Sequence, residues 1–344
     1  MNIADQLKAA AAERILVKDG AYGTQIQALK LVEADYRGSL GLDRDQKGNN
    51  DLLNLTRPDM VGGIAQRFAD AGADVLATNS FNANRISQAD YGAEHLVREI
   101  NIAAARVISK VAEREAQKDG RKRFVAGALG PTNKTLSLSP NVNDPGYREV
   151  DFDTLSDVYV EQIEALVEGG AEIVLIETVF DTLNAKAAIH AARRVDRALP
   201  IMRSMTITDL TGRNLSGHSI AAFWASVRHA EPLSIGLNCS FGASQLRAHV
   251  AALSAVADTL IMAYPNAGLP NDLGEYDEGP ETTAAQVREW CEQGIVNIVG
   301  GCCGTTPEHI AAIARTVASY PPRKMAEPPR WTRLAGIEPM VIAA

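Results

Sequence analysis

Eight short apolar runs, most of them separated by helical stretches, constrain the fold of this chain more than any other feature. Each run is almost continuously apolar rather than alternating, which is typical of parallel strands buried on both faces. Strand and helix alternating eight times predict an α/β fold, a (β/α)8 TIM barrel in a single domain. The runs cover residues 14–20, 73–81, 123–131, 171–180, 200–208, 233–240, 259–268 and 296–304.

Turn signals between the runs support this alternation. Three segments have the pattern of a helix end, a glycine cap and a turn into the next strand: ADAGADV (69–75), VEGGAEI (167–173) and CEQGIVNI (291–298). Helix starts are expected at TRPDM (56–60) and TTPEHI (305–310), with Thr as the cap and Pro in the first turn. A doubly wound open sheet is the alternative, but no G-x-G-x-x-G follows the first run.

The predicted barrel covers residues 10–320, with two unusually long connections at about 20–56 and 130–153. Long loops in compact domains are usually functional or disordered, and both would follow strand C-termini, where barrel active sites lie. Residues 321–344 are rich in Pro and lack a clear period, so they are predicted to form a linker or a wrapped terminus.

Charge and hydrophobicity exclude several classes of protein. The net charge of −8 argues against a bare nucleic-acid binder. No apolar run approaches the roughly 20 residues of a membrane span, and the charged N-terminus does not have the form of a signal peptide. We therefore expect a cytoplasmic protein that acts on neither nucleic acid nor membrane. In that compartment cysteines stay reduced and are more often metal-binding or catalytic than cross-linked.

Three of the four cysteines fall at or just past predicted strand ends: Cys239 after the sixth run, and Cys302 and Cys303 after the eighth. Gly300 and Gly301 free the backbone to leave strand geometry, which two neighbouring thiols need if both are to face one ion. Three protein ligands and an open fourth position are typical of catalytic zinc. Three thiolates make a soft site that suits a substrate which is itself a thiol.

Other interpretations of the cysteines stay open at this point. Cys291 lies within a predicted helix and is interpreted as a small buried hydrophobe. A disulfide between Cys302 and Cys303 would be sterically awkward and out of place in the cytosol. A structural Cys3His zinc site would use His309, which lies in the following helix.

Polar residues close other strands at the same predicted rim: Asp19, Thr78, Asn79, Glu177 and Asn238. Two carboxylates near a zinc thiolate could hold a substrate ammonium group, so an amino-acid thiol would satisfy the whole set.

A structural role is the alternative for these carboxylates, with Glu177 or Asp19 paired to a barrel arginine such as Arg203. A Schiff-base aldolase would need an inward lysine at a strand end. Lys18 is the nearest candidate, but Asp19 is expected to point to the rim in its place.

The residues LNCS (237–240) and GGCCGTTPEH (300–309) resemble the homocysteine S-methyltransferase family. Within it, the chain resembles the branch that forms the N-terminal homocysteine-binding module of cobalamin-dependent methionine synthases. The similarity spans about residues 10–338 and runs through DGAYGTQIQ (19–27), NDLLNLTRPD (50–59), ALGPTNKTLSLSPNVNDPGYR (128–148), IETVFDTLNAKAA (176–188) and YPNAGLPN (264–271).

The resemblance implies a barrel in which Cys239, Cys302 and Cys303 bind zinc, with the homocysteine sulfur on the metal. It also implies that Asp19 and Glu177 face the substrate amino group. The substrate carboxylate would lie at the backbone of Thr78, Asn79, Ser80 and Phe81. No side-chain nucleophile or general base is expected, because the zinc-bound substrate thiolate is itself the nucleophile.

The same resemblance implies a methyltransferase that makes methionine with methylcobalamin supplied in trans. Corrinoid-binding and methyltetrahydrofolate-binding modules or subunits would be its partners, and the tail would lead toward an absent folate module. Two alternatives stay open: a homocysteine methyltransferase that uses a small donor such as betaine or S-methylmethionine, and a structural or redox-sensing zinc protein.

Overall fold

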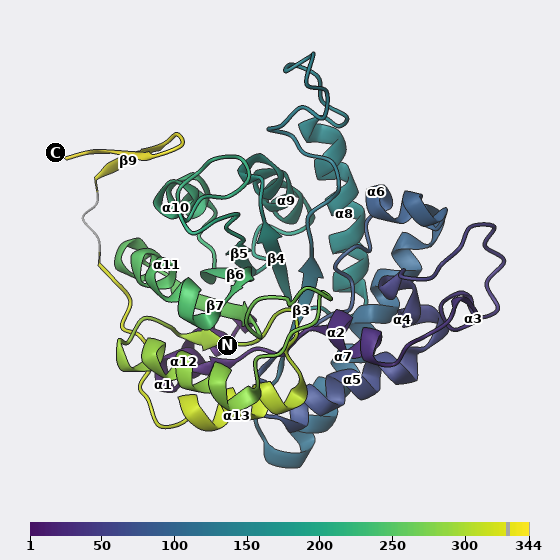
Figure 1. Cartoon of the computed structure of the whole chain (residues 1–344), viewed down its shortest axis with the longest axis horizontal. Coiled ribbons are helices and arrows are strands. Elements are labelled where there is room, and N and C mark those ends of the chain that lie inside the picture. The colour runs from purple at the N-terminus through teal and green to yellow at the C-terminus, as the bar shows by residue number, and fades with distance from the viewer. Residues whose placement is uncertain (328–330, 344) are drawn as a thin grey trace.

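Eight parallel strands lie at the centre of the computed structural model, which describes residues 1–327 and 331–343 (Figure 1). Their order is β1-β8-β7-β6-β5-β4-β3-β2, and a parallel bridge between Lys18 and Val75 joins the two ends. The predicted (β/α)8 barrel is confirmed. The strands are β1 (Leu16–Val17), β2 (Val75–Ala77), β3 (Phe124–Leu129), β4 (Ile173–Val179), β5 (Ile201–Met205), β6 (Ser234–Gly242), β7 (Leu260–Asn266) and β8 (Ile298–Val299).

A long helix follows each strand and packs outside the sheet (Figure 1). These helices are α5 (Pro58–Asp70), α7 (Val97–Asp119), α8 (Phe152–Glu168), α9 (Thr182–Val195), α10 (Ile220–Val227), α11 (Ala243–Val256), α12 (Pro280–Glu292) and α13 (Pro307–Val317). The expected Thr cap is correct for α13, which begins after Thr306, but wrong for α5. Arg57 holds the cap position of α5 because Thr56 is still the last residue of α4 (Leu53–Thr56).

The strands are apolar throughout because both of their faces are buried. Along β4, Ile173 and Leu175 join the core inside the barrel, whereas Val174 and Ile176 join the core between the strands and the helices. This period of two is the ordinary strand alternation. Leu7 of the N-terminal helix α1 (Ile3–Glu13) belongs to the inner core, so α1 covers one end of the barrel. The other end, where the strands have their C-termini, carries the polar residues.

The two long connections differ from each other. The segment predicted as a loop at about 20–56 contains α2 (Tyr22–Ala28), α3 (Glu33–Arg37) and α4, and it joins a small core of its own with α6 (Arg85–Gln88) nearby. The other, between β3 and α8, has neither helix nor strand in its described residues and extends beyond α8 (Figure 1).

The C-terminal tail contains a hairpin that the sequence did not predict. Strands β9 (Thr332–Ala335) and β10 (Pro339–Ile342) pair antiparallel and lie beside α10 (Figure 1). The Ser219 N–H donates to the Ile337 carbonyl at 3.0 Å, and Arg213 pairs with Glu338. Residues 328–330 and 344 of the predicted tail lie outside the described residues. In the described ranges, none of the helices has the length and apolarity needed to cross a membrane.

Candidate metal and substrate site

The structure brings together the three cysteines that the sequence singled out. The Sγ atoms of Cys239, Cys302 and Cys303 all lie within 4.8 Å of one another, and those of Cys239 and Cys303 are 3.9 Å apart. Tetrahedral zinc with Zn–S bonds of about 2.3 Å separates its sulfurs by about 3.8 Å. All three thiols are free and half-buried at the C-terminal end of the barrel, so a disulfide between Cys302 and Cys303 is excluded in this structure.

Left-handed backbone conformations direct the first cysteine into the site. Asn238 points toward the barrel interior, so ordinary strand geometry would turn Cys239 away from it. Instead Cys239 and Ser240 both adopt φ of 62°, which is rare for residues with a side chain. Thr178, at the end of β4, has φ of 58° and is bonded to Asn238. Strain of this kind clusters at functional sites.

The other two cysteines share a turn rather than a strand. Strand β8 ends at Val299, and a Cβ added to Gly301 would overlap Thr305, so this turn requires a glycine. The Cys302 N–H donates to the Pro265 carbonyl at 2.7 Å, and the Cys303 carbonyl accepts from the Ala267 N–H at 2.9 Å. Adjacent residues can therefore present their thiols to one point.

The thiols also share charge. Hydrogen bonds from Cys302 and Cys303 lower the pKa of Cys239 to about 3. The hydrogen bond to Cys239 raises the pKa of Cys303 to about 11, and it raises the pKa of Cys302 as well. Without a metal, one thiolate accepts from two thiols. A divalent cation would take the place of the two shared protons.

An orphaned polar atom beside the cysteines supports the fit to a metal. The Asn266 side chain, at the end of β7, lowers the pKa of Cys239, while its Oδ1 is buried without a hydrogen-bond partner in the described residues. Asn238 Nδ2 lies 3.8 Å from Cys302 Sγ as a donor. Three sulfurs and one unsatisfied oxygen form a donor set that suits zinc with one exchangeable position.

The contacts of His309 and Cys291 decide between the alternative interpretations of these two residues. His309 does not join the cysteines, because its Nε2 donates to the Glu278 carbonyl at 2.8 Å and its Nδ1 accepts from Thr306. The Cys3His interpretation is therefore wrong. Cys291 is buried in α12 and belongs to the outer core, as its interpretation as a hydrophobe required.

A buried ionic network lies inside the barrel next to the cysteines. Leu16 faces the inner core, so the alternation also turns Lys18 inward. Its Nζ donates to Asp19 Oδ1 at 2.8 Å and lies 4.7 Å from the ring centroid of Tyr264. The Tyr264 hydroxyl donates to Glu177 Oε2 at 2.9 Å. Three charged groups and a phenol thus line the floor of the site.

Burial and charge compete in this network. Burial raises the pKa of Glu177, although Lys18 and the Tyr264 hydroxyl lower it, and burial raises the pKa of Asp19 against the effect of Lys18. Burial lowers the pKa of Lys18, but the carboxylates of Asp19 and Glu177 raise it overall. Lys18 therefore stays an ammonium at neutral pH and cannot act as the nucleophile of a Schiff-base aldolase.

The expected inward and outward residues of the first strand are reversed. Asp19 does not point to the rim in place of Lys18: it is 0% exposed, and its Oδ2 accepts from the Ala77 N–H at 2.7 Å. Arg203 pairs with neither carboxylate. It is buried and donates to the Val227 carbonyl at 2.8 Å, so the structural alternative that paired it with Glu177 or Asp19 is wrong. Alternation from Leu16 would turn Lys18 inward, but a strand of two residues is too short to make that alternation evident.

Asn238 links the network to the cysteines. Its Oδ1 accepts from the Ser204 hydroxyl at 2.7 Å, and its Nδ2 donates to Thr178 Oγ1 at 2.8 Å. Ser204 is also bonded to the Tyr264 hydroxyl. Neither Ser204 nor Tyr264 was predicted as a site residue. Both follow from alternation on strands whose inward residues are otherwise apolar.

The segment from Thr78 to Phe81 is held in place by side-chain hydrogen bonds. Thr78 and Ser80 share a hydroxyl hydrogen bond of 2.6 Å, and Ser80 donates to the Ala128 carbonyl at 2.8 Å. In the part of the chain that the structure describes, the backbone N–H groups of Asn79, Ser80 and Phe81 have no protein acceptor. Consecutive free N–H groups form an anion-binding concavity.

A buried acid supports this segment from the long connection after β1. Asp51 Oδ1 accepts from the Asn82 N–H at 3.0 Å, and Asn54 donates to the carbonyls of Asp51 and Asn79 at 2.7 and 2.6 Å. Burial raises the pKa of Asp51 to about 7. Asp51 lies within the motif NDLLNLTRPD (50–59), but the sequence alone predicts no role for it.

We expect Asp51→Asn to stabilise the protein at pH 8 and to have little effect at pH 4. The folded-state pKa lies above the unfolded value, so the stability from protonated Asp51 is present below about pH 4 and is lost as pH rises through 7. Asn resembles the neutral acid, so the gain in unfolding free energy at pH 8 should be about 4 kcal/mol. Urea unfolding at both pH values tests this, with the exposed Asp43→Asn as control. An equal difference at both pH values would contradict it.

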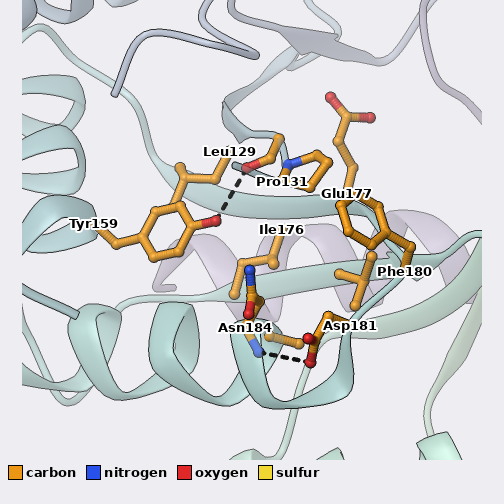
Figure 2. A pocket seen from close by; sticks show the side chains of 11 residues that line it. Leu129, Pro131, Tyr159, Ile176, Glu177, Phe180, Asp181 and Asn184 are labelled. Carbon is orange, nitrogen blue, oxygen red and sulfur yellow. Dashed lines mark hydrogen bonds between the residues drawn. The ribbon is translucent and has the colours of Figure 1, made fainter. Parts of the chain in front are cut away.

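A water-sized cavity lies near this region but is not the substrate site. Its volume is about 10 Å³, and it is lined by residues around the ends of β3 and β4, including Tyr159, Asp181 and Asn184. Figure 2 shows the Glu177 carboxylate pointing away from the other side chains that line this cavity. The Tyr159 hydroxyl donates to the Gly130 carbonyl at 3.2 Å there. The cavity therefore lies behind β4, away from the cysteines.

Comparisons with known proteins agree with this geometry. The family model described as homocysteine S-methyltransferase matches residues 16–317. The homocysteine methyltransferase MmuM from Escherichia coli is similar in fold: its metallated form has a TM-score of 0.72 at 21% identity, and its oxidised form has 0.72 at 19%. Each match covers 90% of this chain and 99% of the MmuM chain.

Proposed function

Because the chain belongs to the homocysteine S-methyltransferase family, we propose that it activates the thiol of homocysteine for methyl transfer from methylcobalamin, giving methionine. The observation that carries this proposal is the cluster of three cysteine sulfurs within 4.8 Å at the C-terminal end of the barrel. A soft, open site of this kind favours a thiol ligand over water. Its free thiols suit the reducing cytoplasm in which we propose that the protein works.

Cys239, Cys302 and Cys303 would hold zinc, and the unpartnered Asn266 Oδ1 lies beside them as a weaker, displaceable oxygen donor. Zinc bound there would act as a Lewis acid that lowers the pKa of the substrate thiol below its free value of about 8.5. The strained backbone at Cys239 and the turn at Gly301 hold the three sulfurs in place before the metal binds.

The two charged groups of the substrate, its carboxylate and its ammonium group, match two polar regions of the site. We assign the substrate carboxylate to the segment Thr78–Phe81, where Asn79, Ser80 and Phe81 offer free N–H groups.

We assign the ammonium group of the substrate to Glu177. Asp19 contributes its negative charge from behind, because its two oxygens already accept from Lys18 Nζ and from the Ala77 N–H. Glu177 Oε2 accepts from Tyr264, and Oε1 has no partner in the described residues, so Oε1 is the oxygen available to the substrate. Asn238 contacts both Cys302 and Ser204, and so links the cysteines to the network that contains Glu177. This link would keep the substrate sulfur and the substrate ammonium group at a fixed separation.

The chain's own residues then bind and orient, and none needs to act as a general base. With methylcobalamin as the donor, the substrate sulfur would form an S–CH3 bond as the Co–CH3 bond broke. Cobalt would keep both electrons of that bond, which would give cob(I)alamin, and the thiol proton would go to solvent. Positioning of the sulfur opposite the leaving group is the contribution of the barrel.

Methylcobalamin would come in trans, on a corrinoid-binding module or subunit, with a methyltetrahydrofolate-binding module or subunit as the source of further methyl groups. The half-exposed cysteines at the barrel mouth support this, since a corrinoid is too large to enter the barrel. A small donor such as S-methylmethionine or betaine is the alternative, and a purely structural or redox-sensing zinc site is the non-enzymatic one.

The test supplies each donor separately to the zinc-loaded chain with homocysteine and measures methionine by mass spectrometry. We expect methionine with methylcobalamin, together with the absorption change of cob(I)alamin. Methionine formed from S-methylmethionine or betaine but not from methylcobalamin would establish the small-donor alternative. No methionine from any donor, with zinc needed only for folding, would establish the structural one.

A further inference from the structure

The loop between β7 and α12 folds back on itself as a short arm, residues 268–278. Pro270 and Tyr276 form an antiparallel bridge, and Asn271 Oδ1 accepts from the N–H groups of Leu273 and Glu275 at 2.9 Å each. Leu273 lies at the exposed tip of the arm. Tyr276 is therefore held at the base of the arm, on the side of the barrel.

Tyr276 contacts the cysteine cluster through both its ring and its hydroxyl. A Cβ added to Gly304 would overlap the Cβ and ring of Tyr276, and Gly304 has φ of 79°, so this residue must be glycine for the ring to lie there. The Tyr276 hydroxyl lies close enough to the Cys303 sulfur to lower the pKa of that thiol. The arm thus packs directly on the turn that carries Cys302 and Cys303.

The base of the arm is anchored on two helix starts. The Glu278 carbonyl accepts from His309 of α13 at 2.8 Å. The Glu278 carboxylate accepts from Thr283 and Gln286 of α12 at 2.6 and 2.9 Å. These contacts hold Glu278 in place, and they therefore restrict the position of Tyr276, which lies two residues before it.

Each sulfur of the cluster then has a polar group beside it. Asn238 Nδ2 lies 3.8 Å from the Cys302 sulfur, the Ser240 backbone N–H lowers the pKa of Cys239, and the Tyr276 hydroxyl lowers the pKa of Cys303. Three thiolates carry more negative charge than one divalent cation neutralises, so each donor stabilises the metal-loaded state. Outer partners of this kind contribute about 10- to 100-fold in metal affinity or activity.

We propose that Tyr276 is a positioning residue of the metal site, whose hydroxyl donates to the Cys303 thiolate and sets how tightly the three cysteines hold zinc. This inference rests on the proposed zinc role of the cluster. It adds a residue that none of the metal-ligand motifs contains.

The test compares Tyr276→Phe, which removes only the hydroxyl, with Tyr320→Phe as a matched control. Tyr320→Phe also removes a phenol hydrogen bond, the one that the Tyr320 hydroxyl donates to Glu292. Tyr320 follows the C-terminal end of α13, whereas Cys302 and Cys303 precede its N-terminal end. Zinc affinity is measured by competition with a chelator, and the sulfur-to-cobalt charge-transfer band is recorded on the Co²⁺-substituted proteins.

We expect Tyr276→Phe to weaken zinc binding by about 10-fold or more and to shift the charge-transfer band, with the Tm of the metal-free protein equal to that of the control. Zinc affinity and band equal to the control would overturn the inference. So would an equal loss of Tm in the metal-free and zinc-loaded variant, which would mark a merely structural role. Failure of the unmodified protein to bind zinc would overturn the proposed function as well, so the two failures are distinguishable.

Discussion

Cys239→Ala should remove zinc from the protein and lower the rate of methyl transfer to homocysteine by about 1,000-fold or more. Lewis-acid stabilisation by a metal is worth several kcal/mol, and about 4 kcal/mol corresponds to that factor. Cys239 is the thiol that carries the shared negative charge, because Cys302 and Cys303 both donate to it. Its loss therefore leaves one sulfur too few to hold the metal. Elemental analysis for zinc and the methionine assay measure the two effects.

Cys291→Ala is the matched control, since it removes the one cysteine that lies in α12, away from the cluster. It should keep one zinc per chain and the full rate, with at most a lower Tm from the lost core volume. Full zinc content and rate in Cys239→Ala would contradict the account of the site.

Glu177→Gln should raise the Kd for homocysteine by about 100-fold, or about 2.7 kcal/mol, within the range for a hydrogen bond to a charged group. The neutral amide cannot balance the substrate ammonium in a buried site. The same variant should bind 4-mercaptobutyrate, which lacks the amino group, as tightly as the unmodified protein does. Calorimetric titration of the zinc-loaded proteins with both thiols measures the difference.

Glu164→Gln, an exposed change on α8, is the control and should bind both thiols normally. Equal weakening of both thiols by Glu177→Gln would contradict the assigned role. It would show that Glu177 only supports Tyr264 and the barrel floor, to which it is bonded.

The barrel itself was predictable because local and global signals agree. The run AEIVLIETVF contains four consecutive apolar residues at 173–176, which is typical of a strand buried on both faces, and β4 occupies Ile173–Val179 within that run. The glycines of the turns adopt the expected left-handed conformation, for example Gly72 and Gly170.

The cysteine cluster was predictable for a different reason. Parallel strands end at the same edge of a closed sheet, so residues near the C-terminal ends of β6 and β8 must lie near each other whatever the loops do. The local backbone that aims the thiols was only partly visible. Gly301 signalled the turn at Cys302, but no sequence pattern announces the left-handed Cys239 and Ser240.

The features that could not be predicted from the sequence depend on contacts between residues far apart in the chain or on very short elements. The inward position of Lys18 depends on two residues of β1, too short a strand for the alternation to be evident, and on the pairing with Asp19. Tyr276 reaches Cys303 only because an arm anchored by His309 folds back over the turn. The hairpin of β9 and β10 forms where the tail meets α10, and no apolar periodicity in the tail predicts it.

Zinc K-edge absorption on the purified chain, with and without homocysteine, tests the central claim most directly. We predict three sulfurs at about 2.3 Å and one lighter ligand in the free protein, becoming four sulfurs when homocysteine is added. That result would establish the open site and the thiol acceptor together. A site of four sulfurs, or no metal at all, unchanged by homocysteine would contradict the account and mark the three cysteines as structural.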